Sequence, residues 1–298
     1  MEIFQDIIPQ KDLCMALGYF DGVHLGHKKV IESAVNFAKK INQKSAVITF
    51  KEHPCCYLWG VKPEYILQKE KRIEYIEKLG IDFLYLLDFN KIKNLDGKEY
   101  IENILYKNFQ PKYIVTGFNH NFGANKSGNT DLLDKYTKIF GYKYEKISPV
   151  KMNDEVISSS IIRKYLQDSK IEKANEMLGK EYSISGKVIK GNELGRTIGF
   201  PTANVEYPDN LIKMPYGCYK TNVKIGDNIY KSITNVGVKP TVEKKSAPLL
   251  ETHILNFDKD IYGQEIEIFF GRFIRPEKKF KSIDELKSQI ISDINIAL

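Results

Sequence analysis

The sequence predicts two domains, a parallel doubly wound α/β domain and, after it, a small antiparallel β-barrel that ends in a helix. In the first part of the chain, apolar runs of strand length alternate with amphipathic stretches at helical spacing, a pattern typical of a parallel sheet covered by helices. Further on, short β-like runs separated by Gly, Pro and Asn replace the long helical period, as in a small barrel. We therefore expect domains over residues 1–181 and 182–298.

In the α/β domain, apolar runs are expected to form strands and amphipathic stretches are expected to form helices. The strands are expected over 13–20, 45–50, 81–89, 113–117 and 142–147. The helices are expected over 26–41, 69–79, 97–108 and 132–140. Gly80 is the expected C-cap of the second helix, and residues 164–181 form a polar, helix-like link to the barrel.

In the barrel domain, the β-like runs lie over 182–189, 218–225, 228–235, 250–256 and 264–273. A final helix begins after Ser282, which together with Glu285 has the spacing of a capping box. This helix has one apolar face, which is expected to lie on the barrel. The face consists of Ile283, Leu286, Ile290 and Ile294.

The composition fits both an enzyme of anionic substrates and a nucleic-acid-binding protein, and the simplest compartment is the cytoplasm. The net charge is +7, but the basic residues form no dense block beside aromatic residues, so no nucleic-acid partner is expected. No secretory leader is visible, and no apolar run reaches the ~18 residues that a membrane span needs. The cysteines have the spacing of neither a disulfide framework nor a metal knuckle; they are Cys14, Cys55, Cys56 and Cys218. The sequence leaves the oligomeric state unknown.

The stretch 17–31 combines the end of an apolar strand, a turn and the start of an amphipathic helix, with His24 and His27 at the junction and Gly26 between them. The first N–H groups of a helix have no internal partner and the helix dipole favours negative charge, so a phosphate chain fits there. Two imidazoles three residues apart can both donate hydrogen bonds to it. The alternatives are zinc ligation and incidental histidines, whereas a P-loop is excluded because the chain has no Gly-x-x-x-x-Gly-Lys-Ser/Thr.

The run Gly-Tyr-Phe-Asp-Gly-Val-His-Leu-Gly-His over 18–27 resembles the HxGH signature of the nucleotidylyltransferase superfamily. Its form resembles the N-terminal half of the bacterial bifunctional riboflavin kinase/FMN adenylyltransferase (FAD synthetase) family. The resemblance implies a Rossmann-like nucleotidylyltransferase domain in which both histidines are catalytic. The implied ATP contacts in this run are Gly18, Phe20, Asp21 and Gly26.

The end of the strand 45–50 carries a second part of the resemblance. The family has Thr-Phe-x-Pro-His-Pro here, and this chain has Glu52 in place of the first proline. A strand that ends in such a loop is where open α/β sheets place ligands. The resemblance implies flavin contacts at Phe50 and His53.

The loop 117–128 resembles the family's Gly-Phe-Asp/Asn-x-x-Phe-Gly segment, and by composition alone it is either a ligand loop or an ordinary turn. The resemblance implies nucleotide contacts at Asn119 and Gly123. Lys126 lies near the position of a family arginine, and a lysine cannot make the bidentate contact of a guanidinium.

Three serines, Ser158, Ser159 and Ser160, precede Arg163 by about one helical turn. Serines that open a helix are N-caps in any protein, but hydroxyls, free helix N–H groups and one arginine also make a phosphate grip. The family has Ser-Ser-Thr/Ser-x-x-Arg here, which implies ATP contacts at the serines and a catalytic role for Arg163. In the implied reaction the FMN phosphate attacks the α-phosphorus of ATP and pyrophosphate leaves. This attack needs no base, only positioning and charge stabilisation.

The stretch 191–204 is more polar than a barrel core requires, and the oxygens of Thr202 and Asn204 suit Mg²⁺. Its Gly-Arg-Thr-Ile-Gly-Phe-Pro-Thr-Ala-Asn resembles the riboflavin kinase signature of the same family. The resemblance implies metal binding by Thr202 and Asn204. The implied ATP contacts are Gly191, Gly195, Arg196 and Gly199.

Further along, Glu-Thr-His-Ile from Glu251 and Asp-Ile-Tyr-Gly over 260–263 also resemble riboflavin kinase motifs. Without the resemblance, Glu251 would be an exposed strand carboxylate; with it, Glu251 is the implied base that activates the riboflavin 5′-hydroxyl. Two more motifs match, Asn-Val-Gly-Val-Lys-Pro-Thr, in which Lys239 replaces an arginine, and Arg-Pro-Glu-Lys-Lys-Phe. They imply flavin contacts at Gly237, Arg275 and Phe280.

These features predict a bifunctional enzyme that phosphorylates riboflavin to FMN in the barrel domain and adenylylates FMN to FAD in the α/β domain. Mg²⁺ is the expected cofactor, and no tightly bound redox cofactor is required. The expected partners are small molecules: riboflavin, FMN, FAD, ATP, ADP and pyrophosphate. One alternative keeps a single activity and makes the other domain a flavin-binding or regulatory module. Another is a non-enzymatic flavin- or RNA-binding protein.

Overall fold

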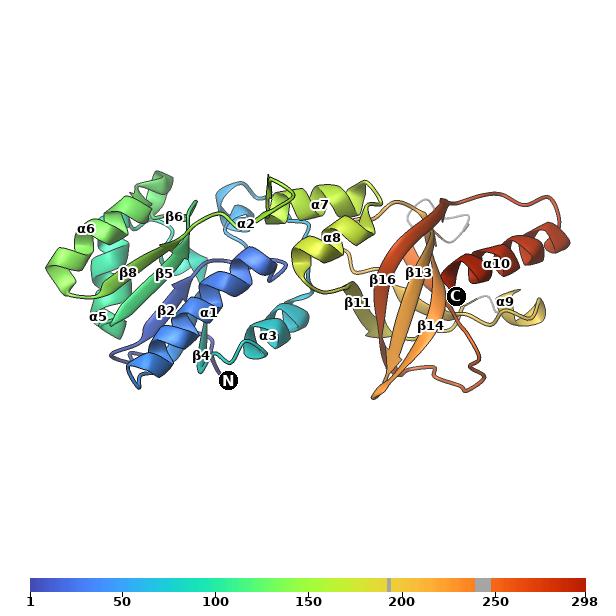
Figure 1. Cartoon of the computed structure of the whole chain (residues 1–298), viewed down its shortest axis with the longest axis horizontal. Helices are drawn as coiled ribbons and strands as arrows, with labels where there is room; N and C mark the ends of the chain where they lie inside the picture. Colours follow the sequence, from blue (N-terminus) through green and yellow to red (C-terminus); the bar gives the residue numbers. More distant parts are fainter. Residues whose placement is uncertain (192–193, 239–247) are drawn as a thin grey trace. The chain divides into compact units, whose positions relative to one another are not determined.

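The computed structural model describes residues 1–191, 194–238 and 248–298, which form two compact units (Figure 1). The first unit contains residues 1–63 and 69–158, and the second contains 64–68 and 159–298. The expected domain boundary after residue 181 stays a prediction. In the second unit, helix α8 (Ile171–Leu178) packs on the barrel strands β11 and β16, and α7 (Ser159–Gln167) packs on α8.

The first unit is built on a six-stranded sheet in which every neighbouring pair is parallel, as predicted. In spatial order the strands are β1 (Glu2–Phe4), β4 (Phe83–Leu87), β3 (Ser45–Phe50), β2 (Cys14–Leu17), β5 (Tyr113–Gly117) and β8 (Lys143–Ile147). The edge strand β1 was missed because its three residues carry no apolar run. The chain leaves β2 toward β3 on one side and later returns to β5 on the other. In such sheets the ligand crevice lies at the carboxyl ends of the strands beside this reversal.

Helices cover both faces of this sheet. They are α1 (Leu25–Lys40), α2 (Cys55–Leu58), α3 (Lys69–Glu77), α4 (Gly97–Glu99), η2 (Tyr100–Tyr106), α5 (Lys107–Phe109) and α6 (Thr130–Phe140), with short 3-10 turns η1 (Phe89–Lys91) and η3 (Ala124–Lys126). The predicted helix over 97–108 is present, but its central part η2 is a π-helix. Two small hairpins complete the unit, β6 (Asn121–Phe122) with β7 (Gly128–Asn129) and β9 (Lys151–Met152) with β10 (Glu155–Val156).

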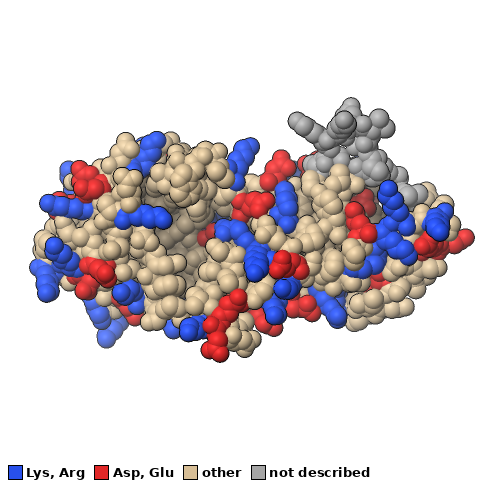
Figure 2. All heavy atoms as spheres, turned by 90° about the horizontal axis from the view of Figure 1, so that it is seen from above, with Lys and Arg blue, Asp and Glu red and all other residues tan. Residues whose placement is uncertain are grey.

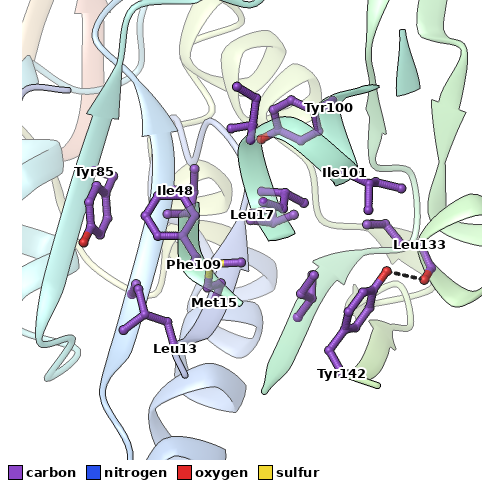
Figure 3. Close-up of a cluster of buried hydrophobic side chains, with 14 of the residues drawn as sticks. Leu13, Met15, Leu17, Ile48, Tyr85, Tyr100, Ile101, Phe109, Leu133 and Tyr142 are labelled. Carbon is purple, nitrogen blue, oxygen red and sulfur yellow. Dashed lines mark hydrogen bonds between the residues drawn. The ribbon is translucent and has the colours of Figure 1, made fainter. Parts of the chain in front are cut away.

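The core of the first unit follows the alternation of side chains along the strands (Figure 3). Met15 and Leu17 of β2 point to the face that η2, α5 and α6 cover, and Tyr100 and Phe109 pack there. The hydroxyl of the buried Tyr142 donates to the Leu133 carbonyl oxygen at 2.6 Å. The fixed core holds the strand ends, and therefore the loops that follow them, in place.

The second unit is the predicted antiparallel barrel. In spatial order its strands are β11 (Tyr182–Lys187), β16 (Glu265–Pro276), β13 (Gly217–Ile225), β14 (Asn228–Val238), β15 (Pro248–Ile254) and β12 (Ala203–Glu206). A bridge between Ile189 and Asn204 nearly closes the ring. Strand β12 was not predicted, because its first two residues end the Gly-rich stretch 191–204 and four residues are too few to show an alternation of their own.

Helix α10 (Ile283–Ala297) packs on the barrel through its last turns. Ser282 is its N-cap and accepts from the Glu285 N–H at 3.2 Å, as predicted, but the Glu285 carboxylate accepts from the N–H of Lys281 instead of the cap residue. Ile290 and Ile294 contact the cluster beneath the helix. The prediction for Ile283 is wrong: its side chain is 56% exposed, because only the C-terminal half of α10 packs on β13 and β14.

A buried ion pair fastens α10 to β16. The carboxylate of Asp293 is 1% exposed and accepts from Nε and Nη2 of Arg275 at 3.0 and 2.7 Å, and from Gln289 at 2.9 Å. The guanidinium of Arg275, an expected flavin contact, therefore forms this ion pair with Asp293. Its flavin role stays a prediction.

Removal of the Asp293 carboxylate is expected to destabilise the second unit strongly. Asp293→Ala leaves Arg275 partly buried without a counter-ion, which costs about 3–5 kcal/mol of unfolding free energy, measured by urea denaturation. Glu172→Ala breaks the exposed pair with Arg272 and should cost about 1 kcal/mol or less. Equal losses in the two variants would contradict this view of the buried pair.

The charged side chains on the visible surface are mixed. On the face shown in Figure 2, Lys and Arg side chains lie among Asp and Glu side chains and gather in no single large patch. None of the described helices is long and apolar enough to cross a membrane.

Candidate active sites

The predicted phosphate loop connects β2 to α1 and is held in an unusual backbone conformation. Phe20 and Val23 have φ of 60° and 41°, values that a β-branched residue such as valine rarely adopts. Gly18 permits this shape, since a Cβ there would lie 2.9 Å from the ring of Phe20. Asp21 and His24 are buried at 4% and 5% exposure. Strained backbone that its surroundings hold in place is typical of ligand-binding loops.

His24 and His27 lie together at the start of α1. His24 is the N-cap, and its Nδ1 accepts from the N–H of His27 at 3.2 Å. The two rings stack with their centroids 3.5 Å apart. Because Nδ1 of His24 is an acceptor, the proton of the neutral ring lies on Nε2, which is then a donor. Gly26 makes room for this ring, because a Cβ there would lie 3.1 Å from Cε1 of His24.

The loop after β3 is closely packed. Phe50 packs partly against the hydrophobic core and meets Phe89 edge-on at 5.3 Å. His53 Nδ1 accepts from the N–H of Cys55 at 3.2 Å, and its ring meets Tyr19 edge-on at 4.6 Å. Glu52, which departs from the family pattern, is exposed. The flavin contacts of Phe50 and His53 stay predictions.

Arg72 on α3 contacts the loops of the candidate site, which no local pattern predicts. It is 2% exposed and donates to the carbonyl oxygens of Tyr19 and Phe50, both at 3.1 Å. It therefore ties the loop after β2 to the end of β3. The run Lys-Glu-Lys-Arg gave no signal, because nothing local shows which of four neighbouring charges is buried.

The loop after β5 owes its shape to close backbone contacts. Gly123 has φ of 72°, and a Cβ there would lie 2.5 Å from the backbone nitrogen of Gly97. Asn119 and Lys126 are exposed, and their nucleotide contacts stay predictions.

His120 in this loop should make stability depend on pH. Its Nε2 is buried without a hydrogen-bond partner in the described chain, and burial lowers its pKa to about 4. The unfolded chain, with a histidine pKa of about 6.5, then binds more protons between these values, so the unfolding free energy falls as the pH drops from about 6.5 toward 4. His120→Phe keeps the ring stack on Phe122 and should flatten this decline in urea titrations. Equal slopes in parent and variant would contradict it.

The predicted serine–arginine grip is divided between the two units. Ser158 ends the first unit, whereas Ser159, Ser160 and Arg163 belong to α7 in the second. Nε of Arg163 donates to the Glu64 carbonyl oxygen at 2.8 Å, within the second unit. The joint action of Arg163 with the two histidines stays a prediction.

The barrel contains a cavity of about 210 Å³ at the predicted kinase site. It brings together Arg196, Thr202 and Asn204 from the Gly-rich motif, and Asp260 and Tyr262 from the later one. The remaining lining residues are Val188, Pro201, Ala203, Thr252, Ile254, Phe257, Asp258, Lys259 and Ile261.

Two glycines shape the wall of this cavity. A Cβ on Gly191 would lie 2.4 Å from the Asn204 amide, and one on Gly195 would lie 2.4 Å from the Phe200 carbonyl oxygen. Gly199 has φ of 91° and ends the turn after α9 (Leu194–Thr197). The Asn204 side chain donates to the Thr202 carbonyl oxygen at 3.3 Å.

Glu251 lies in the middle of a row of polar side chains across three strands. It is paired with Asn204 of β12 on one side and with Asn235 of β14 on the other. Directly opposite residues of antiparallel strands have Cβ atoms about 4.5–5.5 Å apart. The register thus makes Glu251 a neighbour of Asn204 and also of Asn235, which belongs to the motif Asn-Val-Gly-Val-Lys-Pro-Thr.

A ladder of buried hydroxyls lies on the inner face beside this row. Thr252, on the cavity wall, bonds Thr234 at 2.9 Å; Thr234 bonds Thr221 at 2.9 Å; and Thr221 bonds Ser232 at 2.7 Å. These hydroxyls lie in positions that usually hold apolar side chains, so sequence analysis did not find them. They fix β15 against β14 and so fix the register of Glu251.

The other expected flavin contacts of the barrel lie near the ends of β14 and β16. A Cβ on Gly237 would lie 2.0 Å from the carboxylate of Glu277, so a larger residue there requires the exposed Glu277 side chain to move. The Phe280 ring lies 5.8 Å from the Arg275 guanidinium. Lys239 lies outside the described residues.

Zinc ligation by His24 and His27 would need a third ligand nearby. Within the parts of the chain that the structure describes, no three His, Cys, Asp or Glu side chains gather at one point.

The first unit, a parallel α/β sheet with a histidine pair at a helix start, is typical of a nucleotidylyltransferase-like domain. The second unit, a small barrel with a polar cavity, is typical of a flavokinase-like domain. The family model of FAD synthetase matches residues 7–161, and that of riboflavin kinase matches residues 178–298. The chain belongs to the family of bifunctional riboflavin kinase/FMN adenylyltransferases.

Relatives of that name match nearly the whole chain. The Bacillus subtilis protein is 38% identical over 286 residues, 94% of this chain and 89% of the relative. The Escherichia coli K12 protein is 31% identical over 288 residues, 96% of this chain and 91% of the relative. A crystal structure described as a macrolide-efflux protein from Streptococcus pneumoniae has the same fold, with a TM-score of 0.91 and 31% identity over 100% of this chain and 99% of that one.

Proposed function

We propose that the chain makes FAD in two steps, phosphorylation of riboflavin in the barrel and adenylylation of the resulting FMN in the α/β unit. The observation that carries this proposal is a separate polar site in each unit. One is the stacked pair His24–His27 at a helix start. The other is the barrel cavity that Thr202 and Asn204 line, with Glu251 paired to Asn204 in the sheet.

In the barrel, the nucleophile is a neutral alcohol. Glu251 would take the proton of the riboflavin 5′-hydroxyl while its oxygen attacks the γ-phosphorus of ATP, and ADP leaves. Asn204 and Asn235 are the neighbours of Glu251 on the adjacent strands. Arg196 and Lys259 line the cavity and would neutralise the ATP phosphates.

Thr202 and Asn204 fit a magnesium ion, because both line the cavity and have a side-chain oxygen atom, and that ion prefers a few protein oxygens together with substrate phosphates. Bound there, Mg²⁺ would neutralise charge on the transferring phosphoryl group.

In the α/β unit, the nucleophile is the FMN phosphate, which is already an anion. Its oxygen attacks the α-phosphorus of ATP, and pyrophosphate leaves. His24 would donate from Nε2 to a phosphate oxygen, and the adjacent His27 ring would share the developing charge. Ser158, at the end of the same unit, would contribute to holding the triphosphate.

The second candidate is a chain with one activity, in which the other unit binds flavin or regulates. Glu52, Lys126 and Lys239 depart from the family pattern and motivate it. In either case we place the protein in the cytoplasm, in keeping with its four free cysteines.

An incubation of the purified chain with riboflavin and Mg-ATP tests both candidates. Chromatography should show FMN first and FAD later, and FMN supplied directly should give FAD without a lag. FMN as the only product, or FAD formed only from added FMN, would support the single-activity candidate. Neither product, with active controls, would contradict the enzyme function.

A further inference from the structure

Arg72 is a buried charge that the chemistry above does not use. Its guanidinium is 2% exposed, donates to two backbone carbonyl oxygens, and has its central carbon 4.3 Å from the ring centroid of Tyr19. Carbonyl oxygens and an aromatic face orient a guanidinium, but they are neutral groups and leave its full positive charge in place.

No carboxylate balances this charge. Within residues 1–191, 194–238 and 248–298, no Asp or Glu forms an ion pair with Arg72. Its helix neighbour Glu74 pairs with Lys71 at 2.8 Å and with Lys78. A buried cation without a counter-ion is costly, so an anion that binds nearby gains from it.

The position of Arg72 shows which anion fits. Tyr19 follows the carboxyl end of β2, and Phe50 is the last residue of β3. Open α/β sheets bind ligands at these ends of their strands. The chain continues from Tyr19 to the His24–His27 pair and from Phe50 to His53, whose ring contacts Tyr19. The Arg72 guanidinium therefore contacts both loops that we expect to hold the substrates of adenylylation. Both substrates, ATP and FMN, carry phosphate groups.

We propose that Arg72 is a positioning residue of the adenylylation site that acts in two ways. Its hydrogen bonds fix the loop after β2 relative to the loop after β3, and its unbalanced charge favours the phosphate anions bound between them. This inference rests on the proposed function of the first unit.

Three substitutions in the full-length chain separate the two actions. Arg72→Lys keeps the charge, Arg72→Gln keeps hydrogen-bond donors without charge, and Arg72→Met keeps neither. The readouts are kcat and KM for FAD formation with FMN and Mg-ATP, the inhibition constant of inorganic pyrophosphate, and the melting temperature. Riboflavin phosphorylation in the barrel serves as an internal control.

We expect Arg72→Gln and Arg72→Met to raise the KM for ATP and the inhibition constant of pyrophosphate about 10- to 100-fold, while Arg72→Lys stays within about tenfold of the parent. Riboflavin phosphorylation should be unchanged in all three. Lys78→Gln, which removes an exposed charge just after α3, should change none of these values.

The proposal is overturned if Arg72→Lys and Arg72→Gln change the KM for ATP and the inhibition constant of pyrophosphate equally, in proportion to their loss of melting temperature. Arg72 would then only stabilise the fold. If the parent chain makes no FAD, the proposed function fails, and direct calorimetric titration with pyrophosphate decides the inference. Unchanged pyrophosphate affinity in Arg72→Gln would then overturn it, and a loss restored in Arg72→Lys would support it.

Discussion

Replacement of Glu251 by Gln is expected to lower the rate of FMN formation about 10²- to 10⁴-fold, the usual contribution of a general base. The riboflavin hydroxyl must lose a proton as it attacks, and an amide cannot accept that proton. The side chain keeps its size and its place between Asn204 and Asn235, so the barrel should stay folded. The measurement is the initial rate of FMN formation from riboflavin and Mg-ATP, followed by chromatography.

The same variant should convert added FMN to FAD at the parent rate, because the histidine pair lies in the other compact unit. Glu206→Gln is the matched control, since Glu206 is an exposed carboxylate on β12, the strand that carries Asn204. That control should change neither rate. Loss of both activities in Glu251→Gln would contradict the division into two sites, and unchanged FMN formation would remove Glu251 from the role of base.

Local sequence patterns predicted most of the helices and strands. Each strand and helix of the first unit that has an apolar period was predicted, whereas β1 and β12 were missed because three- and four-residue strands have no period of their own. Ile283 was assigned to the packed face of α10 because a periodic pattern cannot show where along a helix the contact with the barrel ends.

In the candidate sites, too, local sequence patterns predicted some residues but not those that depend on tertiary structure. The histidine pair could be predicted, since an N-cap and a residue three positions later must lie on one helix turn. That Asn204 and Glu251 are neighbours depends on strand register, which no local pattern shows. Arg72 and the hydroxyl ladder from Thr252 depend wholly on tertiary burial, and no local pattern marks them.

Replacement of His27 by Ala is expected to lower the rate of FAD formation from FMN about 10²- to 10³-fold, the usual cost of losing one donor that stabilises developing charge. His27 is a better choice than His24, because the His24 side chain also caps α1 and its loss would weaken the helix. The backbone N–H of His27, which donates to that cap, remains in the variant. Riboflavin phosphorylation should stay at the parent rate. Asn36→Ala, which removes an exposed polar side chain from the same helix, should leave both rates unchanged. Survival of FAD formation within a few-fold in His27→Ala would show that the loop after β2 is not the centre of adenylyl transfer.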